Sequence, residues 1–316
     1  MEEPFLFGKL VDPIEDAGFK LIFGRETVSE ELIKDLLNSI FANDPLLSNI
    51  AEVTFINTEK PHENAGGRGL RYDIRCVTST GHHFIVEMQK AEQRHFLERC
   101  IYYLSRDFAE QGYKGKDKTN KHWDFSLMPV VGVFFCNFPV RELSAKPVVQ
   151  ARLLDVEDHQ PIGDYVRYVF IQLPCFKKGE KECATLIEQW IYNIKNMGQM
   201  QNVAFKEQRE IFAYLDSVAN VAALSPSERN TYEAALMRAR DYNAQLKTAR
   251  EKSWESGRKE GRKEGRKEGR KEGMQQGRQE EKILIVRNMA ALHMPLSLIA
   301  QTVQLTEEEV ERILRN

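Results

Sequence analysis

The chain has 316 residues, of which 42% are hydrophobic and 29% charged, so it is long enough and apolar enough to bury a sizeable core. Its formal net charge of −2 excludes a polycation, so a surface that binds nucleic acid must be local. No apolar run is long enough to cross a bilayer, and no secretory signal follows the start Met-Glu-Glu-Pro; we therefore expect a soluble, cytoplasmic protein without a membrane partner.

The N-terminal half combines helical and strand-like patterns. In chain order the pattern predicts a turn and short apolar segment (12–25), a helix (29–42), three strands (52–58, 68–78 and 82–89), a helix (91–110) and two strands (128–138 and 165–173). Ser29 is the predicted N-cap of the first helix, and Ser-Thr-Gly at 79–81 predicts a tight hairpin. This order predicts an α/β protein with a mixed sheet.

The sequence becomes helical beyond about residue 180. Apolar spacing predicts helices over 180–196, 203–223 and 226–255, with Pro226 at the first helical position of the third. We therefore divide the chain into a core (1–180) and a helical extension that packs on it (181–256).

A four-residue repeat, Gly-Arg-Lys-Glu, runs from Gly257 to Gly273, and Gly277 keeps its register; we take residues 257–279 as one segment. Between Glu251 and Lys282 there are 11 basic and 8 acidic side chains, a net charge of only +3, which does not indicate a nucleic-acid clamp. Each Gly in a helix costs roughly 1 kcal/mol relative to Ala, so a solvated linker is one interpretation of the repeat. The other is a long helix whose glycine stripe lets two chains pair closely.

The last segment, 280–316, is predicted to form a small helical unit. Three short amphipathic segments follow one another, and Thr306 with Glu309 forms a capping box at the start of the last. The layout is that of a helix-turn-helix, although Glu307 and Glu308 oppose phosphate contact at that helix start. Packing or oligomerisation is the alternative role.

The residues that can carry chemistry are Asp73, Glu87 and Gln89. Alternate residues of a strand share a face, so Glu87 and Gln89 point the same way, and the hairpin brings Asp73 alongside Glu87. Two carboxylates a few ångströms apart suit Mg²⁺, which polarises a phosphoryl oxygen and activates water for attack. Gln89 would orient that water.

A structural interpretation of the same acids is also open. Arg71 and Arg75 are expected on the face of Asp73, so Asp73 can be a cross-strand salt-bridge residue instead, and Glu87 can pair with Arg99 or another cation. His82 and His83 are adjacent in a strand and point to opposite faces, which predicts surface residues and no shared metal. The five cysteines lack CxxC spacing and predict free thiols.

Several motifs together give the chain a resemblance to a known family. They are Asp12-Pro followed by Asp16-Ala-Gly-Phe-Lys-Leu-Ile-Phe-Gly24, Arg71-Tyr-Asp-Ile74, Phe84-Ile-Val-Glu-Met-Gln89, Arg99-Cys-Ile-Tyr-Tyr103 and Gln-Gly-Tyr at 111–113. Over roughly residues 10–255 the chain resembles the Rpn-type recombination-promoting nucleases, transposase-like proteins of the PD-(D/E)XK nuclease superfamily. The resemblance implies a restriction-endonuclease-like αβββαβ core and Mg²⁺-dependent DNA endonuclease activity, with Mn²⁺ as a substitute ion.

The resemblance also implies roles for individual residues. Asp73 and Glu87 would bind the metal, and Gln89 would stand where the superfamily has a lysine, without its positive charge. Four further side chains match family positions, Asp16 as an additional acid and three as phosphate contacts or supports of the acids: Lys20, Arg99 and Tyr103.

Two functions from different classes follow. The first is a DNA endonuclease linked to recombination or mobile elements, with DNA as partner, no small-molecule cofactor, and dimerisation or another homo-oligomeric state through the C-terminal helices. The alternative is a weakly active or inactive nuclease fold that serves as a DNA-binding or oligomerisation module.

Overall fold

A computed structural model describes residues 9–60, 70–114 and 127–315. The chain forms two compact units, Met1–Arg238 and Ala239–Asn316. Among the described residues no helix combines the length and the apolar character that a membrane span requires. The finer division into four segments stays a prediction.

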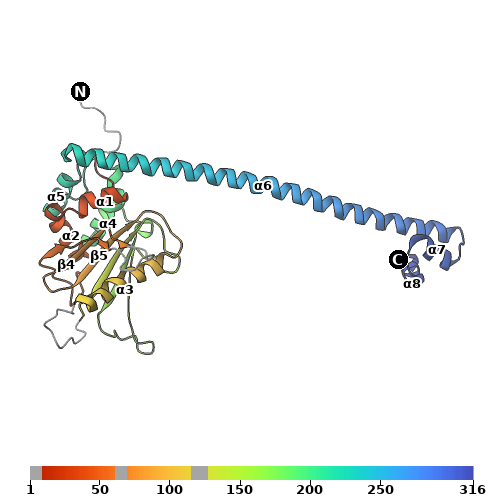
Figure 1. Cartoon of the computed structure of the whole chain (residues 1–316), viewed down its shortest axis with the longest axis horizontal. Helices are drawn as coiled ribbons and strands as arrows, with labels where there is room; N and C mark the ends of the chain where they lie inside the picture. The colour runs from red at the N-terminus through yellow and green to blue at the C-terminus, as the bar shows by residue number, and fades with distance from the viewer. Residues whose placement is uncertain (1–8, 61–69, 115–126, 316) are drawn as a thin grey trace, which may run out of the picture. The chain divides into compact units, whose positions relative to one another are not determined.

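The first unit is built on a six-stranded mixed sheet (Figure 1). Its strands, in spatial order, are β1 (Val53–Phe55), β4 (Ile74–Thr78), β5 (His83–Gln89), β6 (Val130–Cys136), β8 (Val166–Gln172) and β7 (Val148–Arg152). The central strands β5, β6 and β8 are parallel, whereas β1, β4 and β7 are antiparallel to their neighbours. The predicted mixed sheet is therefore confirmed.

A second, two-stranded sheet lies beside the start of β4 in the sequence. It pairs β2 (Glu59–Lys60) with β3 (Leu70–Arg71) in antiparallel register. Residues 68 and 69 of the strand predicted at 68–78 lie outside the described residues. At residues 72 and 73 the chain leaves β3 and enters β4, so the single long strand of the prediction is interrupted at the proposed acid.

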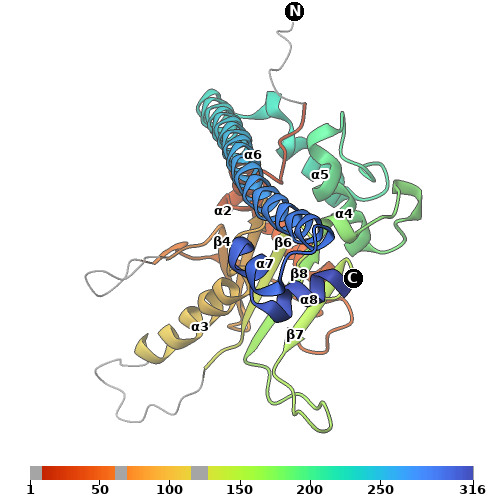
Figure 2. The ribbon, with the colours of Figure 1, turned by 90° about the vertical axis from the view of Figure 1, so that its right-hand side faces the viewer.

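Helices cover both faces of the large sheet (Figures 1 and 2). One face packs on four helices, α1 (Asp16–Phe23), α2 (Glu26–Ile40), α4 (Leu186–Asn196) and α5 (Glu210–Ala219), and the other on α3 (Phe96–Lys114). Phe84, Val86 and Met88 of β5 belong to the first core, and Ile85 belongs to the second. Because side chains alternate along a strand, Glu87 and Gln89 lie on the α3 face.

Two predicted details of this unit are wrong. Helix α2 begins at Glu26, and Ser29 is buried inside it, where its hydroxyl accepts from the Arg25 amide (3.0 Å) and donates to the Ile22 carbonyl (2.7 Å). Ser29 thus joins the end of α1 to α2 and does not cap α2. Strand β7 was not predicted, because it is an edge strand that is mostly exposed and lacks an alternating apolar pattern.

The connections toward the C-terminus also differ from the predicted helices. The segment predicted at 180–196 is helical only from Leu186, where Thr185 and Glu188 form a capping box, and the segment predicted at 203–223 only over α5. Single-turn 3-10 helices connect these elements: η1 (Leu173–Cys175), η2 (Glu180–Glu182), η3 (Met197–Gln199) and η4 (Val221–Ala223).

Helix α6 (Pro226–Ala291) is 66 residues long and includes the whole glycine repeat. Of the two sequence interpretations, the long helix is the one that the structure shows. Within the first unit its start is anchored by the Tyr232 hydroxyl, which accepts from the Asp12 amide at 2.8 Å, and by an Arg25–Glu228 ion pair at 2.9 Å.

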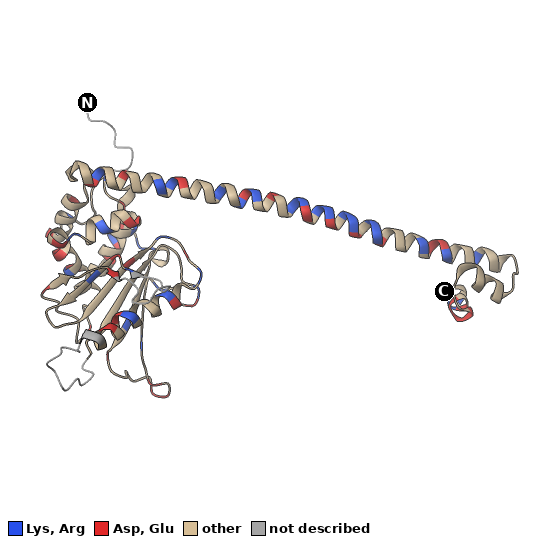
Figure 3. Cartoon of the chain, viewed as in Figure 1, with Lys and Arg blue, Asp and Glu red and all other residues tan. Residues whose placement is uncertain are grey.

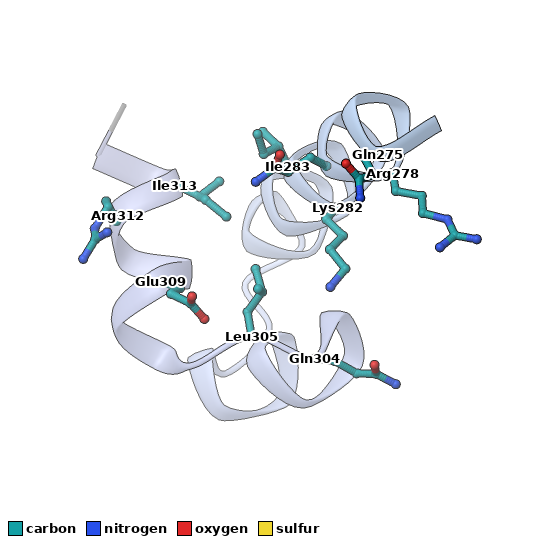
Figure 4. A pocket seen from close by; sticks show the side chains of 10 residues that line it. Gln275, Arg278, Lys282, Ile283, Gln304, Leu305, Glu309, Arg312 and Ile313 are labelled. Atoms are coloured by element: carbon teal, nitrogen blue, oxygen red, sulfur yellow. The ribbon is translucent and has the colours of Figure 1, made fainter. Parts of the chain in front are cut away.

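The second unit has its own small core. The last turns of α6 pack on α7 (Leu296–Val303) and α8 (Glu307–Arg315) through a cluster centred on Val286, Ile299 and Val310. The capping box that the sequence predicts is present, with the Glu309 amide donating to Thr306 Oγ1 at 3.3 Å and the Thr306 amide donating to Glu309 at 2.8 Å. A groove between these helices includes Ile283, Leu305 and Ile313 (Figure 4).

Candidate active site

Asp73 and Glu87 meet where β4 begins and β5 ends. The register pairs Ile74 with Val86, so the preceding Asp73 stands beside Glu87. The Asp73 amide donates to Glu87 Oε1 at 3.1 Å, and the amide of Met88 donates to Asp73 Oδ2 at 3.0 Å. Each carboxylate is therefore fixed by the backbone of the opposite strand, as the hairpin pattern predicts.

Both acids are held away from water. The Asp73 side chain is 9% exposed, and Glu87 is 4% exposed. Burial raises the pKa of Asp73 to about 6, while the Lys20 ammonium opposes that rise. Burial, reinforced by the nearby Asp73 charge, raises the pKa of Glu87 well above its usual value. Two buried carboxylates whose charges repel each other form a site that a cation would stabilise.

A chain of hydrogen bonds runs from Glu87 to α3. Gln89 Nε2 donates to Glu87 Oε2 at 3.2 Å, and Arg99 of α3 donates to Gln89 Oε1. Because the Gln89 side-chain oxygen accepts from Arg99, the Gln89 side-chain nitrogen faces Glu87. The Arg99 guanidinium also lies over the ring of Tyr103, 5.7 Å from its centroid, which supports its position.

Helix α1 supplies the other side of the site. Lys20 Nζ lies 3.0 Å from Asp73 Oδ1 and 2.7 Å from Asp16 Oδ1. Burial raises the pKa of the Asp16 carboxyl, but hydrogen bonds to Lys20 and Asp73 outweigh it and leave that pKa below its usual value. The structure thus brings together all seven residues that the sequence and the resemblance single out.

The donor set fits a hard divalent cation held by few protein ligands. Two carboxylates that share one site are the oxygen ligands that Mg²⁺ and Mn²⁺ prefer, and Mg²⁺ commonly keeps several waters beside one or two carboxylates. No group of three or more His, Cys, Asp or Glu side chains suited to a metal occurs in the part of the chain that the structure describes. The arrangement therefore offers such an ion two carboxylate ligands.

The two arginines predicted as alternative partners of Asp73 are engaged elsewhere. Arg71 lies 3.4 Å from Glu59, and Arg75 Nε donates to Asp107 Oδ1 at 2.7 Å. Asp73 instead pairs with Lys20, which belongs to a distant helix. The proposed salt-bridge role for Asp73 through Arg71 or Arg75 is therefore wrong.

A buried polar network that the sequence analysis missed lies farther along β5. Asp107 of α3 is fully buried and accepts from Arg75 and pairs with His83 Nδ1 at 2.8 Å. The expectation that His83 is a surface residue is wrong, because its side chain is only 14% exposed and faces Asp107. An acid inside the apolar stripe of an amphipathic helix is the signal that marks Asp107.

Comparison with known proteins gives one match. A family model described as PD-(D/E)XK nuclease family transposase matches residues 13–249, well over half of the chain. Neither the curated proteins nor the solved structures contain a match. The matched region includes every candidate residue of the site.

Proposed function

The chain belongs to the PD-(D/E)XK nuclease family transposases, and on that premise we propose that it is a DNA endonuclease that requires Mg²⁺, with Mn²⁺ as a substitute. Asp73, Glu87 and Gln89 form its catalytic group. Nucleases of this superfamily typically use divalent metal ions. The observation that carries the proposal is the pair of buried carboxylates with raised pKa values, each hydrogen-bonded to the opposite strand.

Asp73 and Glu87 would hold the ion. Such an ion supplies Lewis-acid polarisation of a phosphodiester oxygen and activates water near neutral pH. Their fixed geometry means that no reorganisation of the two carboxylates is needed when the charge of the phosphate changes. DNA is the partner that this chemistry implies, in recombination or the movement of mobile elements.

Gln89 would orient the attacking water, and Arg99 would supply the positive charge that a glutamine lacks. The guanidinium stands one hydrogen bond behind Gln89, so its field reaches the site without direct contact with Glu87. Lys20 adds a second cation at Asp73, from which it can contact a phosphate. Tyr103 and Asp16 support these two cations.

Cleavage of supercoiled plasmid tests the proposal. Wild type should nick or linearise the plasmid in Mg²⁺ or Mn²⁺ and leave it intact in EDTA, and Asp73→Asn should abolish cleavage. If the wild type binds DNA but does not cut it in either Mg²⁺ or Mn²⁺, the weakly active or inactive binding module becomes the better description. The observation that supports this second function is the neutral Gln89, which stands where the superfamily has a lysine.

We further propose that the protein forms homo-oligomers through its C-terminal helices, and that the oligomer is a dimer. The small second unit exposes a set of large apolar side chains: Leu284, Leu292, Leu296, Leu298 and Leu314. Singly exposed leucines are ordinary, but five on so small a unit support a role in association with another chain. Light scattering of the full chain and of Leu284→Glu tests this, and a monomeric wild type would exclude it.

A cytoplasmic location completes the proposal. It is supported by the free state of the cysteines, four of which are buried among apolar side chains.

A further inference from the structure

The middle of α6 carries a one-sided basic surface that its average charge conceals. Six cations line a single shallow groove along the helix: Lys259, Arg262, Lys263, Arg266, Lys267 and Arg270. The colouring of Figure 3 shows Lys and Arg recurring along this stretch. All six side chains are exposed. We name this set the basic face.

The repeat itself creates the basic face. An α-helix turns about 100° per residue, so a four-residue repeat advances each residue type by about 40° more than a full turn. Within one repeat the arginine and the lysine point about 100° apart around the helix axis. Because each repeat is rotated by a further ~40°, the arginines and lysines of successive repeats come to lie on the same side of the helix, in one sector. The intervening acids, Glu260, Glu264 and Glu268, fall roughly 90–170° away from the centre of that sector. Over residues 259–270 the six cations thus lie on one side of the helix and the three acids lie on the other.

The basic face has no ion-pair partner among the residues that the structure describes. In the described part of the chain, none of its six cations lies within ion-pair distance of an acid. Arg262, Arg266 and Arg270 follow one another at i,i+4 spacing, and such like-charge pairs weaken a helix. An anion along this side would relieve the repulsion, so its binding and the helical state would stabilise each other.

The chemistry of the basic face selects among polyanions. The repeat from 257 to 273 has no apolar side chain, so the helix has nothing to insert into a lipid surface. It has no aromatic side chain on which unpaired bases could stack, which disfavours single strands. It also lacks Asn and Gln, which read adenine, and its row of exposed cations suits phosphate oxygens, whose contacts carry no sequence information.

We propose that the basic face binds the phosphate backbone of duplex DNA without sequence preference. Its six cations span about 17 Å of helix axis at 1.5 Å per residue, comparable with five base-pair steps. The choice of DNA over duplex RNA rests on the proposed function, because a DNA nuclease meets DNA as its substrate. The basic face is therefore a second contact with DNA, separate from the acids of the first unit.

Two four-site variants of the full chain test this inference. The face variant carries Lys259→Gln, Lys263→Gln, Arg266→Gln and Arg270→Gln. The matched control removes the same charge from other sides of α6 with Arg250→Gln, Arg258→Gln, Lys271→Gln and Arg278→Gln. Glutamine forms helices as well as lysine or arginine does, so neither variant should lose α6, which circular dichroism checks.

Binding to a 30-base-pair duplex of arbitrary sequence is measured in EDTA over a range of salt concentrations. The face variant should bind at least about tenfold more weakly, and its logarithmic salt dependence should be shallower by about 3–4, since each phosphate contact contributes about 0.9. The control should stay within about twofold of wild type. On adding duplex, amides 257–273 of the wild type should become more protected from hydrogen exchange.

Three results would overturn the inference. They are equal losses in both variants, no duplex binding by the wild type, and tighter binding to duplex RNA or to anionic lipid vesicles than to DNA. Binding in EDTA requires no catalysis, so a failure of the proposed nuclease activity would leave this result standing. Conversely, if the protein is an active nuclease and the face variant binds DNA as tightly as the wild type, this inference alone is refuted.

Discussion

The Asp73 amide donates to the Glu87 carboxylate at 3.1 Å, while Asp73 itself accepts from the amide that follows Glu87. This reciprocal pairing makes the two acids one unit, placed by the register of β4 and β5. Neither carboxylate can move without breaking a bond to the other strand. The fold therefore holds two mutually repelling carboxylates close together, and several consequences of this repulsion can be measured.

The first consequence concerns pH. Protons compete with a metal ion for Asp73, whose pKa is about 6, and for Glu87, whose pKa is also raised, so apparent Mn²⁺ affinity should fall by at least about tenfold per pH unit below pH 6. Lys20 lowers the pKa of Asp73, so Lys20→Gln should move the midpoint to higher pH. The control is Lys34→Gln, which removes a lysine paired with Glu31. Isothermal titration with Mn²⁺ at several pH values gives the affinities; equal midpoints in all three proteins would contradict this assignment.

The second consequence concerns stability without metal. The pKa of Glu87 is higher in the folded than in the unfolded chain, so the folded state binds the extra proton, and the contribution of Glu87 to stability falls as pH rises above about 4.5, by at most ~1.4 kcal/mol per unit. Glu87→Gln cannot ionise and should flatten this decline while losing the stabilisation by Mg²⁺. Urea unfolding in EDTA and in Mg²⁺ at pH 5 and pH 8 measures both. A Glu87→Gln protein that Mg²⁺ still stabilises as strongly as wild type would remove Glu87 from the metal site.

The third consequence concerns Arg99, which acts on the site through Gln89. Arg99→Gln removes the charge and frees the Gln89 oxygen, so kcat should fall by roughly 10- to 100-fold with little change in KM for DNA. Arg94→Gln, an exposed arginine just before α3, is the control and should leave both constants unchanged. A rise in KM alone would instead make Arg99 a simple DNA contact.

The fourth prediction separates a structural acid from a catalytic one. Asp107 is fully buried against Arg75 and His83, so Asp107→Ala would leave a buried cation unpaired and should lower the free energy of unfolding by about 3–5 kcal/mol. Cleavage per folded molecule should persist, because the network does not include Asp73 or Glu87. Chemical denaturation measures the predicted loss of stability, and a cleavage assay at low temperature measures the retained activity. An Asp107→Ala protein that keeps full stability but loses cleavage would make Asp107 a catalytic acid.

Sequence periodicity predicted the parts of the site that lie within one hairpin. Alternation along β5 and the 79–81 turn suffice to bring Asp73 to Glu87. The Lys20–Asp73 pair joins residues far apart in the chain, and only the family resemblance pointed to Lys20. Ser29 was misread because its hydroxyl bonds to the end of α1, a tertiary contact that an N-cap pattern imitates. The basic face depends on helix geometry, so net charge alone could not reveal it.

The central claim is that Asp73 and Glu87 hold a divalent cation for DNA cleavage. Its most direct test is the plasmid cleavage rate of Glu87→Gln in Mg²⁺ and in Mn²⁺, beside Glu98→Gln, which removes an exposed acid of α3. We predict that Glu98→Gln cleaves at the wild-type rate and that Glu87→Gln loses at least about 100-fold in both metals. Cleavage by Glu87→Gln at the wild-type rate, with the same dependence on metal, would contradict the account.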